Sequence, residues 1–130
     1  MSFEFLEKEK KPGDICSLYE SLGWKKYLDI DKFSFEKAME NSLLVIYAYE
    51  NNKLVGTGRI ISDGIINAYI CGIGVDPNYQ NLGIGSEILE RLVKKCEKSK
   101  LHIQLVCDED LVGYYNLRGF KKFAVAMKKD

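Results

Sequence analysis

The chain has 130 residues, with 19 basic and 19 acidic side chains and a sequence pI of about 6.6. This length predicts one domain over residues 1–130. The balanced charge excludes the positive field typical of proteins that bind nucleic acid or an anionic membrane. No apolar run approaches the roughly 20 residues that cross a bilayer, and the N-terminal "MSFEFLEKEKK" has no hydrophobic signal segment. We therefore expect a cytoplasmic protein with no nucleic-acid or membrane partner.

The four cysteines do not predict a metal site. Cys16, Cys71, Cys96 and Cys107 form no CxxC or CxxH pairing, and His102 is the single histidine. Three of the four lie within apolar runs, which favours buried, reduced thiols. We expect no metal cofactor.

The first half of the chain predicts strands and helices in mixed order. Weak alternation favours a short strand over residues 3–8. Helical spacing predicts one helix with Asp14 as its N-cap and Gly23 at its end, and a second helix capped by Ser34. Three strands joined by tight turns follow, in antiparallel order, over residues 43–50, 53–62 and 65–75, with Asn51-Asn52 and Asp63-Gly64 as the turns.

The second half predicts one long helix and three shorter elements. Apolar residues repeat at helical spacing from Ile88 to Cys96, and Glu87/Arg91 and Glu90/Lys94 form pairs four residues apart. A strand over 101–107, a short helix over 111–119 and a final strand or hairpin over 120–129 follow. The predicted fold is α/β (α+β): a mixed, mostly antiparallel sheet with a central βαβ crossover and helices on both faces.

The segment "VDPNYQNLGIGS", residues 75–86, stands at that crossover between a strand and the long helix. A turn of this kind leaves several backbone N–H groups unpaired at the positive end of the helix dipole, so it favours an anion. Gly83 and Gly85 remove the side chains that would keep a phosphate away, and the Gln80 side chain adds a donor. The P-loop pattern GxxxxGK[ST] is absent, and the third glycine of a Rossmann fingerprint is missing.

The longer string "VDPNYQNLGIGSEILERL" resembles motif A of the GNAT superfamily of acetyl-coenzyme A dependent acyltransferases. The pattern [Gln/Arg]-x-x-Gly-x-[Gly/Ala] is met by Gln80, Gly83 and Gly85. A second block of the family, an aromatic-Tyr pair ahead of Gly-Phe, is met by "YYNLRGF", residues 114–120. Together with the order of elements, the two blocks cover essentially the whole chain, so the resemblance implies a single GNAT N-acetyltransferase domain.

The resemblance implies where acetyl-coenzyme A (acetyl-CoA), the expected cosubstrate, binds. Main chain around Ile73 and Val75 on the fourth strand holds the pantetheine arm, and a bulge in this strand, at Gly72 or Gly74, separates it from the next strand. Backbone amides of the motif A loop hold the diphosphate; these belong to Gln80, Asn81, Leu82, Gly83, Ile84, Gly85 and Ser86.

The resemblance also implies direct attack by a neutral amine on the thioester. The backbone amide of Ile73 stabilises the oxyanion, and Tyr115 is the general acid that protonates the thiolate leaving group. A phenol is protonated at neutral pH, which suits this role. Tyr114 and Tyr115 point about 100 degrees apart on a helix, so at most one of them faces the thioester, and the other packs or lies at the rim of the site.

The general base departs from the family pattern. Many GNAT proteins carry Glu or Asp on the fourth strand, where this sequence has Tyr69 and Gly72. Two interpretations of Asp108, Glu109 and Asp110 stay open: one of them acts as the base through ordered water, or all three are solvated loop charges that cap the next helix. His102 is expected to be structural, at the strand end away from the chemistry.

The acceptor is not specified by the motifs. In the family, the segment that corresponds to residues 23–35 here forms part of the wall around the acceptor. Its aromatic side chains suit a small amine; they are Trp24, Tyr27, Phe33 and Phe35. The alternative is that these side chains only close the edge of the core. The function expected is N-acetylation of a small primary amine. The alternatives are an acyl-CoA-binding sensor without turnover and a protein or peptide acetyltransferase. The exposed edge of the last strand leaves a monomer or a homodimer open.

Overall fold

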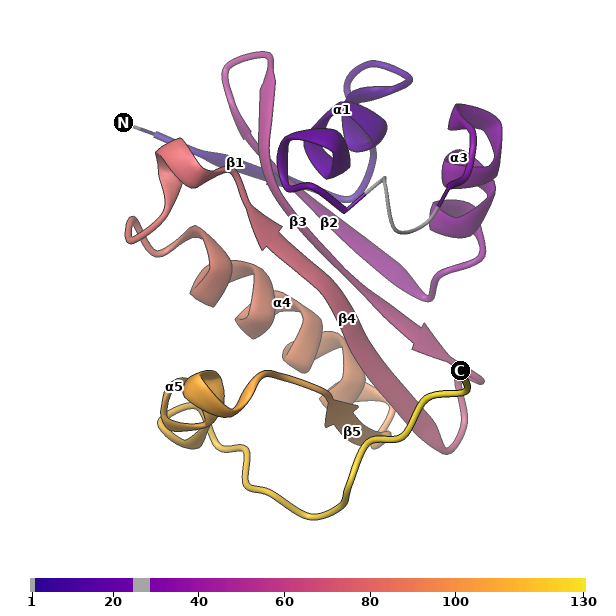
Figure 1. The fold of residues 1–130 in the computed structure, drawn as a ribbon, viewed down its shortest axis with the longest axis vertical. Coiled ribbons are helices and arrows are strands. Elements are labelled where there is room, and N and C mark those ends of the chain that lie inside the picture. Colours follow the sequence, from indigo (N-terminus) through magenta and orange to yellow (C-terminus); the bar gives the residue numbers. More distant parts are fainter. Residues whose placement is uncertain (1, 25–28) are drawn as a thin grey trace.

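The computed structural model describes residues 2–24 and 29–130. The described residues form one five-stranded sheet with helices on both faces (Figure 1). The strands are β1 (Glu4–Leu6), β2 (Leu44–Glu50), β3 (Lys53–Ser62), β4 (Asn67–Val75) and β5 (His102–Leu105). The helices are α1 (Asp14–Ser21), α3 (Lys32–Glu40), α4 (Ile84–Lys98) and α5 (Val112–Asn116), with 3₁₀ turns at Pro77–Tyr79 and Glu109–Leu111.

The strands lie in the order β1-β2-β3-β4-β5. The first four pair antiparallel, and β4 pairs with β5 in parallel through the α4 crossover. Both predicted turns join strands: Asn51 has a φ of 54°, and Oδ1 of Asp63 accepts hydrogen bonds from the amides of Ile65 and Ile66 at 2.9 and 2.8 Å. The predicted mixed sheet with its βαβ unit is confirmed.

Helix α4 covers one face of the sheet because β3 has no side chains where the helix crosses it. A Cβ at Gly58 would lie 2.7 Å from Cγ2 of Ile88, and one at Gly56 would lie 2.9 Å from Cγ2 of Ile84. Ile88 and Leu92 are fully buried in the core of this face. Close packing of α4 therefore fixes where its N-terminus meets the end of β4.

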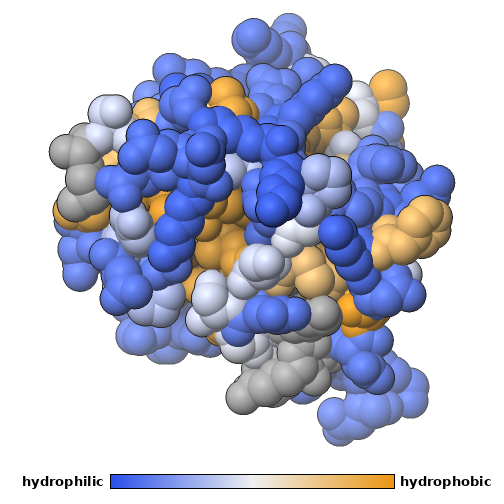
Figure 2. Space-filling model, turned by 90° about the horizontal axis from the view of Figure 1, so that it is seen from above, coloured by the Kyte–Doolittle hydropathy of each residue, from blue (hydrophilic) through white to orange (hydrophobic). Residues whose placement is uncertain are grey.

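Helices α1 and α3 cover the opposite face over a second core, which includes Ile15, Phe35 and Tyr49. The Tyr49 hydroxyl donates to Oδ2 of Asp14 at 2.6 Å, which ties β2 to the start of α1. Figure 2 shows the end of the molecule that is uppermost in Figure 1; hydrophilic residues cover most of it, and hydrophobic residues appear only in patches between them. Among the described residues, no helix is long and apolar enough to span a bilayer.

Two predicted helix starts are wrong by a few residues. Gly13, with a φ of 96°, precedes α1, so Asp14 is the first helical residue and not the cap. Asp31, not Ser34, caps α3: its carboxylate accepts a hydrogen bond from the Ser34 amide at 2.8 Å. The cap precedes the first helical residue; at α1 it is Gly13, which has no side chain, and at α3 it is Asp31, three residues before Ser34.

The predicted final strand or hairpin over residues 120–129 is also wrong. This part of the structure contains no strand, and the side chains of Phe123, Val125 and Met127 are 63%, 86% and 92% exposed. The apolar alternation is real, but a strand needs a neighbour for its backbone hydrogen bonds. Within the described chain, β5 pairs only with β4, so its outer edge stays open.

Candidate active site

Strands β4 and β5 separate where the site forms. Their pairing ends at Ile70 and Leu105. Just beyond, Gly72 has a φ of 64°, and the register between β3 and β4 shifts between Thr57 and Arg59. A positive φ favours glycine, so the residue type allows the bulge. The bulge expected in this strand is confirmed at Gly72.

A hollow of about 330 Å³ opens at this separation. Strand β4 lines one side with its residues 70–73, and the end of β5 and the loop that follows line the other side with residues 105–108. Tyr115 of α5, Leu111 and Trp24 complete the lining.

A second hollow of about 630 Å³ follows β4 to the start of α4. It shares Trp24, Ile73, Leu111 and Tyr115 with the first hollow, so the two adjoin. The other lining residues that belong to the predicted coenzyme site are Val75, Gln80, Asn81, Gly83, Ile84, Gly85 and Ser86. Leu82 does not line it, and its side chain is 46% exposed.

The N-terminus of α4 faces this second hollow. The first intrahelical bond runs from the Glu87 amide to the Gly83 carbonyl at 3.1 Å, and no side chain caps the helix. Gly83 has a φ of 85°, and a Cβ placed there would meet nothing within 4 Å. A Cβ at Gly85 would contact only Cγ2 of Val75, at 3.7 Å. The amides of the first turn have no intrahelical acceptor, so this end can bind an anion.

The turn ahead of the loop is held by Asp76, a residue that the sequence reasoning missed. Asp76 is 6% exposed; its Oδ1 accepts a hydrogen bond from the Asn78 amide at 2.8 Å, and Oδ2 lies 3.6 Å from Nζ of Lys53. Its own amide donates to the Val55 carbonyl at 2.8 Å. The Asp-Pro sequence, typical of turns, was the available signal. Nε2 of Gln80 donates to the Val75 carbonyl at 3.2 Å, and the same amide group carries a second N–H.

The two adjacent tyrosines take different positions, as predicted. Tyr115 lines both hollows. Burial raises its pKa, so the phenol is protonated at neutral pH. The Tyr114 hydroxyl lies 2.8 Å from Oγ of Ser86, and the Arg118 guanidinium stacks 3.6 Å from the centre of the Tyr114 ring. Nη2 of Arg118 donates to Oγ of Ser86 at 3.0 Å, so a cation not identified from the sequence lies beside the loop.

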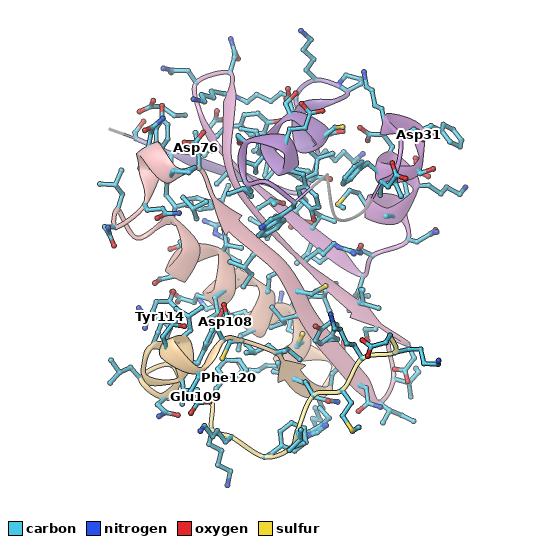
Figure 3. The ribbon with its side chains drawn as sticks, in the orientation of Figure 1. Asp31, Asp76, Asp108, Glu109, Tyr114 and Phe120 are labelled. Carbon is cyan, nitrogen blue, oxygen red and sulfur yellow. The ribbon has the colours of Figure 1, made fainter. Side chains whose placement is uncertain are left out.

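The three acids after β5 have different surroundings, and Figure 3 labels two of them, Asp108 and Glu109. Glu109 is bound by Nζ of Lys122 at 2.6 Å. Asp108 lines the smaller hollow, whereas Glu109 and Asp110 do not. Asp108 occupies the N-cap position of the 3₁₀ turn, but its side chain makes no capping hydrogen bond. The capping interpretation is therefore wrong for the Asp108 side chain.

The proposed acceptor wall divides into several parts. Trp24 lines both hollows and packs edge-on against Tyr19, with ring centres 5.0 Å apart. Phe35 is 1% exposed and belongs to the core, and Phe33 is 77% exposed. Tyr27 lies outside the described residues. His102 pairs with Asn67 at the far end of β4, away from the hollows as expected.

Cys71 and Cys107 are half-buried thiols that line the smaller hollow, whereas Cys16 and Cys96 are buried. The part of the chain that is described contains no group of three His, Cys, Asp or Glu side chains able to hold a metal ion.

Comparison with protein families gives a match over most of the chain. The sequence model of the Acetyltransferase (GNAT) family matches residues 9–120. An uncharacterized N-acetyltransferase, ycf52, from Pyropia yezoensis is 32% identical over 114 residues, which cover 84% of this chain and 64% of that protein. The histone acetyltransferase TAP1 of Glycine max is 28% identical over 120 residues, covering 83% of this chain and 51% of that protein. The chain thus spans less than two thirds of the length of these relatives.

A protein of unknown function from meticillin-resistant Staphylococcus aureus has a similar solved structure. The TM-score is 0.84 at 24% sequence identity, and the match covers 99% of each chain. At this identity the likeness concerns the fold, and it confirms the predicted arrangement of strands and helices.

Proposed function

Because the chain belongs to the GNAT acetyltransferase family, we propose that it transfers the acetyl group of acetyl-CoA to a primary amine of a small molecule. The observation that carries this proposal is the continuity of the site. The anion-binding end of α4 adjoins the separation of β4 and β5, and Tyr115 lines both. Acetyl-CoA fits this arrangement, with its diphosphate at the end of α4 and its thioester at the separation of the strands.

The residues present fit a coenzyme A diphosphate. The first turn of α4 has no side-chain cap, and neither Gly83 nor Gly85 places an atom between its amides and the hollow. Backbone amides at a helix N-terminus bind phosphate well. We propose that the loop from Gln80 to Ser86 binds the diphosphate and that main chain at Ile73 and Val75 binds the pantetheine arm.

Two groups of this chain are proposed to act on the thioester. Acetyl-CoA supplies the activated acetyl group. The Ile73 amide, next to the Gly72 bulge, is the proposed donor to the developing oxyanion. The Tyr115 phenol, whose pKa is raised by burial, is the proposed donor of a proton to the departing thiolate.

Asp108 is proposed as the group that removes the proton of the amine. It is the carboxylate after β5 that lines the smaller hollow, and its side chain makes no capping bond. Glu109 is held by Lys122. The base therefore comes from the loop after β5 and not from the fourth strand, where Gly72 stands.

Release of the coenzyme A thiol from acetyl-CoA tests this function, measured over a panel of small amines, amino sugars, polyamines and peptides. We expect turnover with a small amine, and Tyr115→Phe should lower kcat by about 100-fold or more with unchanged coenzyme binding. Tight binding of acetyl-CoA without turnover on any acceptor would instead support a sensor. Turnover on peptides alone would support the protein acetyltransferase alternative, the activity in the name of the Glycine max relative.

A further inference from the structure

Arg59 is a half-buried cation on the sheet face that α1 and α3 cover. Its neighbour Gly58 faces α4, and side chains alternate along a strand, so Arg59 faces the opposite side. It pairs across the sheet with Cys71, and Nη1 donates to Oγ of Ser42 at 3.0 Å. The Tyr19 hydroxyl and Nε of Arg59 both lie within 4 Å of the position that a Cβ would take at Gly72. Burial raises the pKa of Tyr19, and the Arg59 charge and a hydrogen bond with the Arg59 side chain oppose that shift.

The Arg59 guanidinium has no anionic partner within the described part of the chain. Its Nε is buried and makes no hydrogen bond, and no carboxylate there forms a salt bridge with it. Nη1 has its bond to Ser42, but a buried charged N–H such as Nε that has no acceptor is costly, because its lost hydration is not replaced. The site therefore favours an anion from outside the chain.

Arg59 lines neither hollow, but it lies beside Gly72, which lines the smaller hollow and has no side chain. A Cβ at Gly72 would lie 3.8 Å from Nε of Arg59 and 3.0 Å from the Tyr19 hydroxyl. Both Gly72 and Cys71 line the smaller hollow, next to Ile73. The guanidinium thus stands one residue from the amide proposed to face the oxyanion.

We propose that Arg59 binds a carboxylate on the acceptor, so that the preferred acceptor is an amino acid with an apolar side chain. This inference rests on the proposed function. If the acceptor's carboxylate binds Arg59, its amine lies close to Ile73. This fits an amino acid, in which the carboxylate and the amine are attached to the same carbon. A planar guanidinium matches a carboxylate in geometry and charge.

The surface beyond Arg59 suits an apolar side chain. Ile61 and Tyr69 pair with each other two residues along from the Arg59 and Cys71 pair, so they lie on the same face. They are 46% and 40% exposed. Apolar contact there would add affinity for a leucine-like or phenylalanine-like acceptor.

The test compares L-leucine with isoamylamine, which lacks the carboxylate, and with L-leucinamide, which replaces it by a neutral amide. The kcat/KM of L-leucine divided by that of each amine without a carboxylate should fall about 10- to 100-fold in Arg59→Met. Arg59→Lys, which keeps the positive charge, should show a smaller fall. Arg59→Met does not alter the intrinsic reactivity of the three amines, so a change in the kcat/KM ratio reports the contact between Arg59 and the carboxylate. Arg91→Met is the matched control, because Arg91 pairs with Glu87 on the surface of α4; its ratio should equal that of the wild type.

A second readout needs no turnover. Binding of N-acetyl-L-leucine and of N-isoamylacetamide is measured by calorimetry on the protein with coenzyme A bound. We expect the wild type to prefer the carboxylate and Arg59→Met to lose that preference, even if no amine is acetylated and the proposed function fails. Two outcomes would overturn the role of Arg59 and leave the proposed function standing. One is acetylation of the amines with the same kcat/KM ratios in wild type and Arg59→Met; the other is equal binding of the two products by the wild type.

Discussion

The Tyr114 hydroxyl lies 2.8 Å from Oγ of Ser86, which joins α5 to the first turn of α4. The bond is partly buried, so Tyr114→Phe should lower the free energy of unfolding by about 0.5–1.5 kcal/mol. The Phe ring keeps the stacking surface for Arg118, and Tyr115 is untouched. Denaturant unfolding of Tyr114→Phe and Tyr115→Phe, with kcat for each, checks this. A larger loss of kcat in Tyr114→Phe than in Tyr115→Phe would contradict the assigned roles.

Arg118 should contribute to coenzyme binding through its charge. It donates to Ser86 beside the α4 N-terminus and is exposed to solvent. An exposed contact of this kind is weak, so Arg118→Met should raise the Kd of coenzyme A about two- to fivefold. The difference should shrink at high salt because ions screen exposed charges. Titrations at two salt concentrations, with Arg91→Met as the unaffected control, measure it.

Gly85→Ala should separate stability from binding. The added Cβ has ordinary contact distance to Val75, and alanine in a helix is favoured over glycine by up to about 1 kcal/mol. We expect a protein that is equally stable or more stable and yet binds coenzyme A more weakly, since the methyl group would stand before the amides proposed to bind the diphosphate. Gly85→Val should weaken coenzyme A binding further. Gly113→Ala, also in a helix and in open space, is the control. Unchanged affinity in Gly85→Ala and Gly85→Val would exclude this turn as the phosphate site.

Asp108→Asn should lower kcat/KM about 100-fold at neutral pH if Asp108 takes the proton of the amine. The loss should narrow at higher pH, where more of the acceptor is already neutral. Asp110→Asn, two residues away and outside the hollow, should be close to wild type. Rates of the two variants from pH 7 to 10 decide the matter, and equal rates would remove Asp108 from the mechanism.

Glu9 should make the protein less stable as pH rises toward neutrality. Burial and a hydrogen bond with Glu36 raise the pKa of Glu9 to about 7. A carboxyl whose pKa is higher in the folded state stabilises the fold at low pH and loses that contribution as pH rises through the folded value. The free energy of unfolding should therefore fall between about pH 5 and pH 8, and Glu9→Gln should flatten that slope. The exposed Glu7→Gln serves as control; a slope that persists in Glu9→Gln contradicts the assignment.

Local spacing was enough to predict most elements. The α4 periodicity from Ile88 to Cys96, the Asn51-Asn52 turn and the glycines of the α4 N-terminus each act within a few residues, so the sequence shows them directly. The final strand could not be predicted in this way. Its alternation at Phe123, Val125 and Met127 specifies a face, but only a pairing partner makes a strand.

By itself the sequence determined the family, most of the order of elements and the glycine-containing turn before the long helix, because these depend on neighbours along the chain. Only the tertiary structure decided which polar groups share the site. It placed Asp108 at the smaller hollow and Glu109 against Lys122, and it set Arg59 opposite Cys71 and beside Gly72. Arg59 and Gly72 are distant along the chain, whereas Asp108 and Glu109 are adjacent and differ in the direction of their side chains. Strand pairing and the bulge at Gly72 determine these positions.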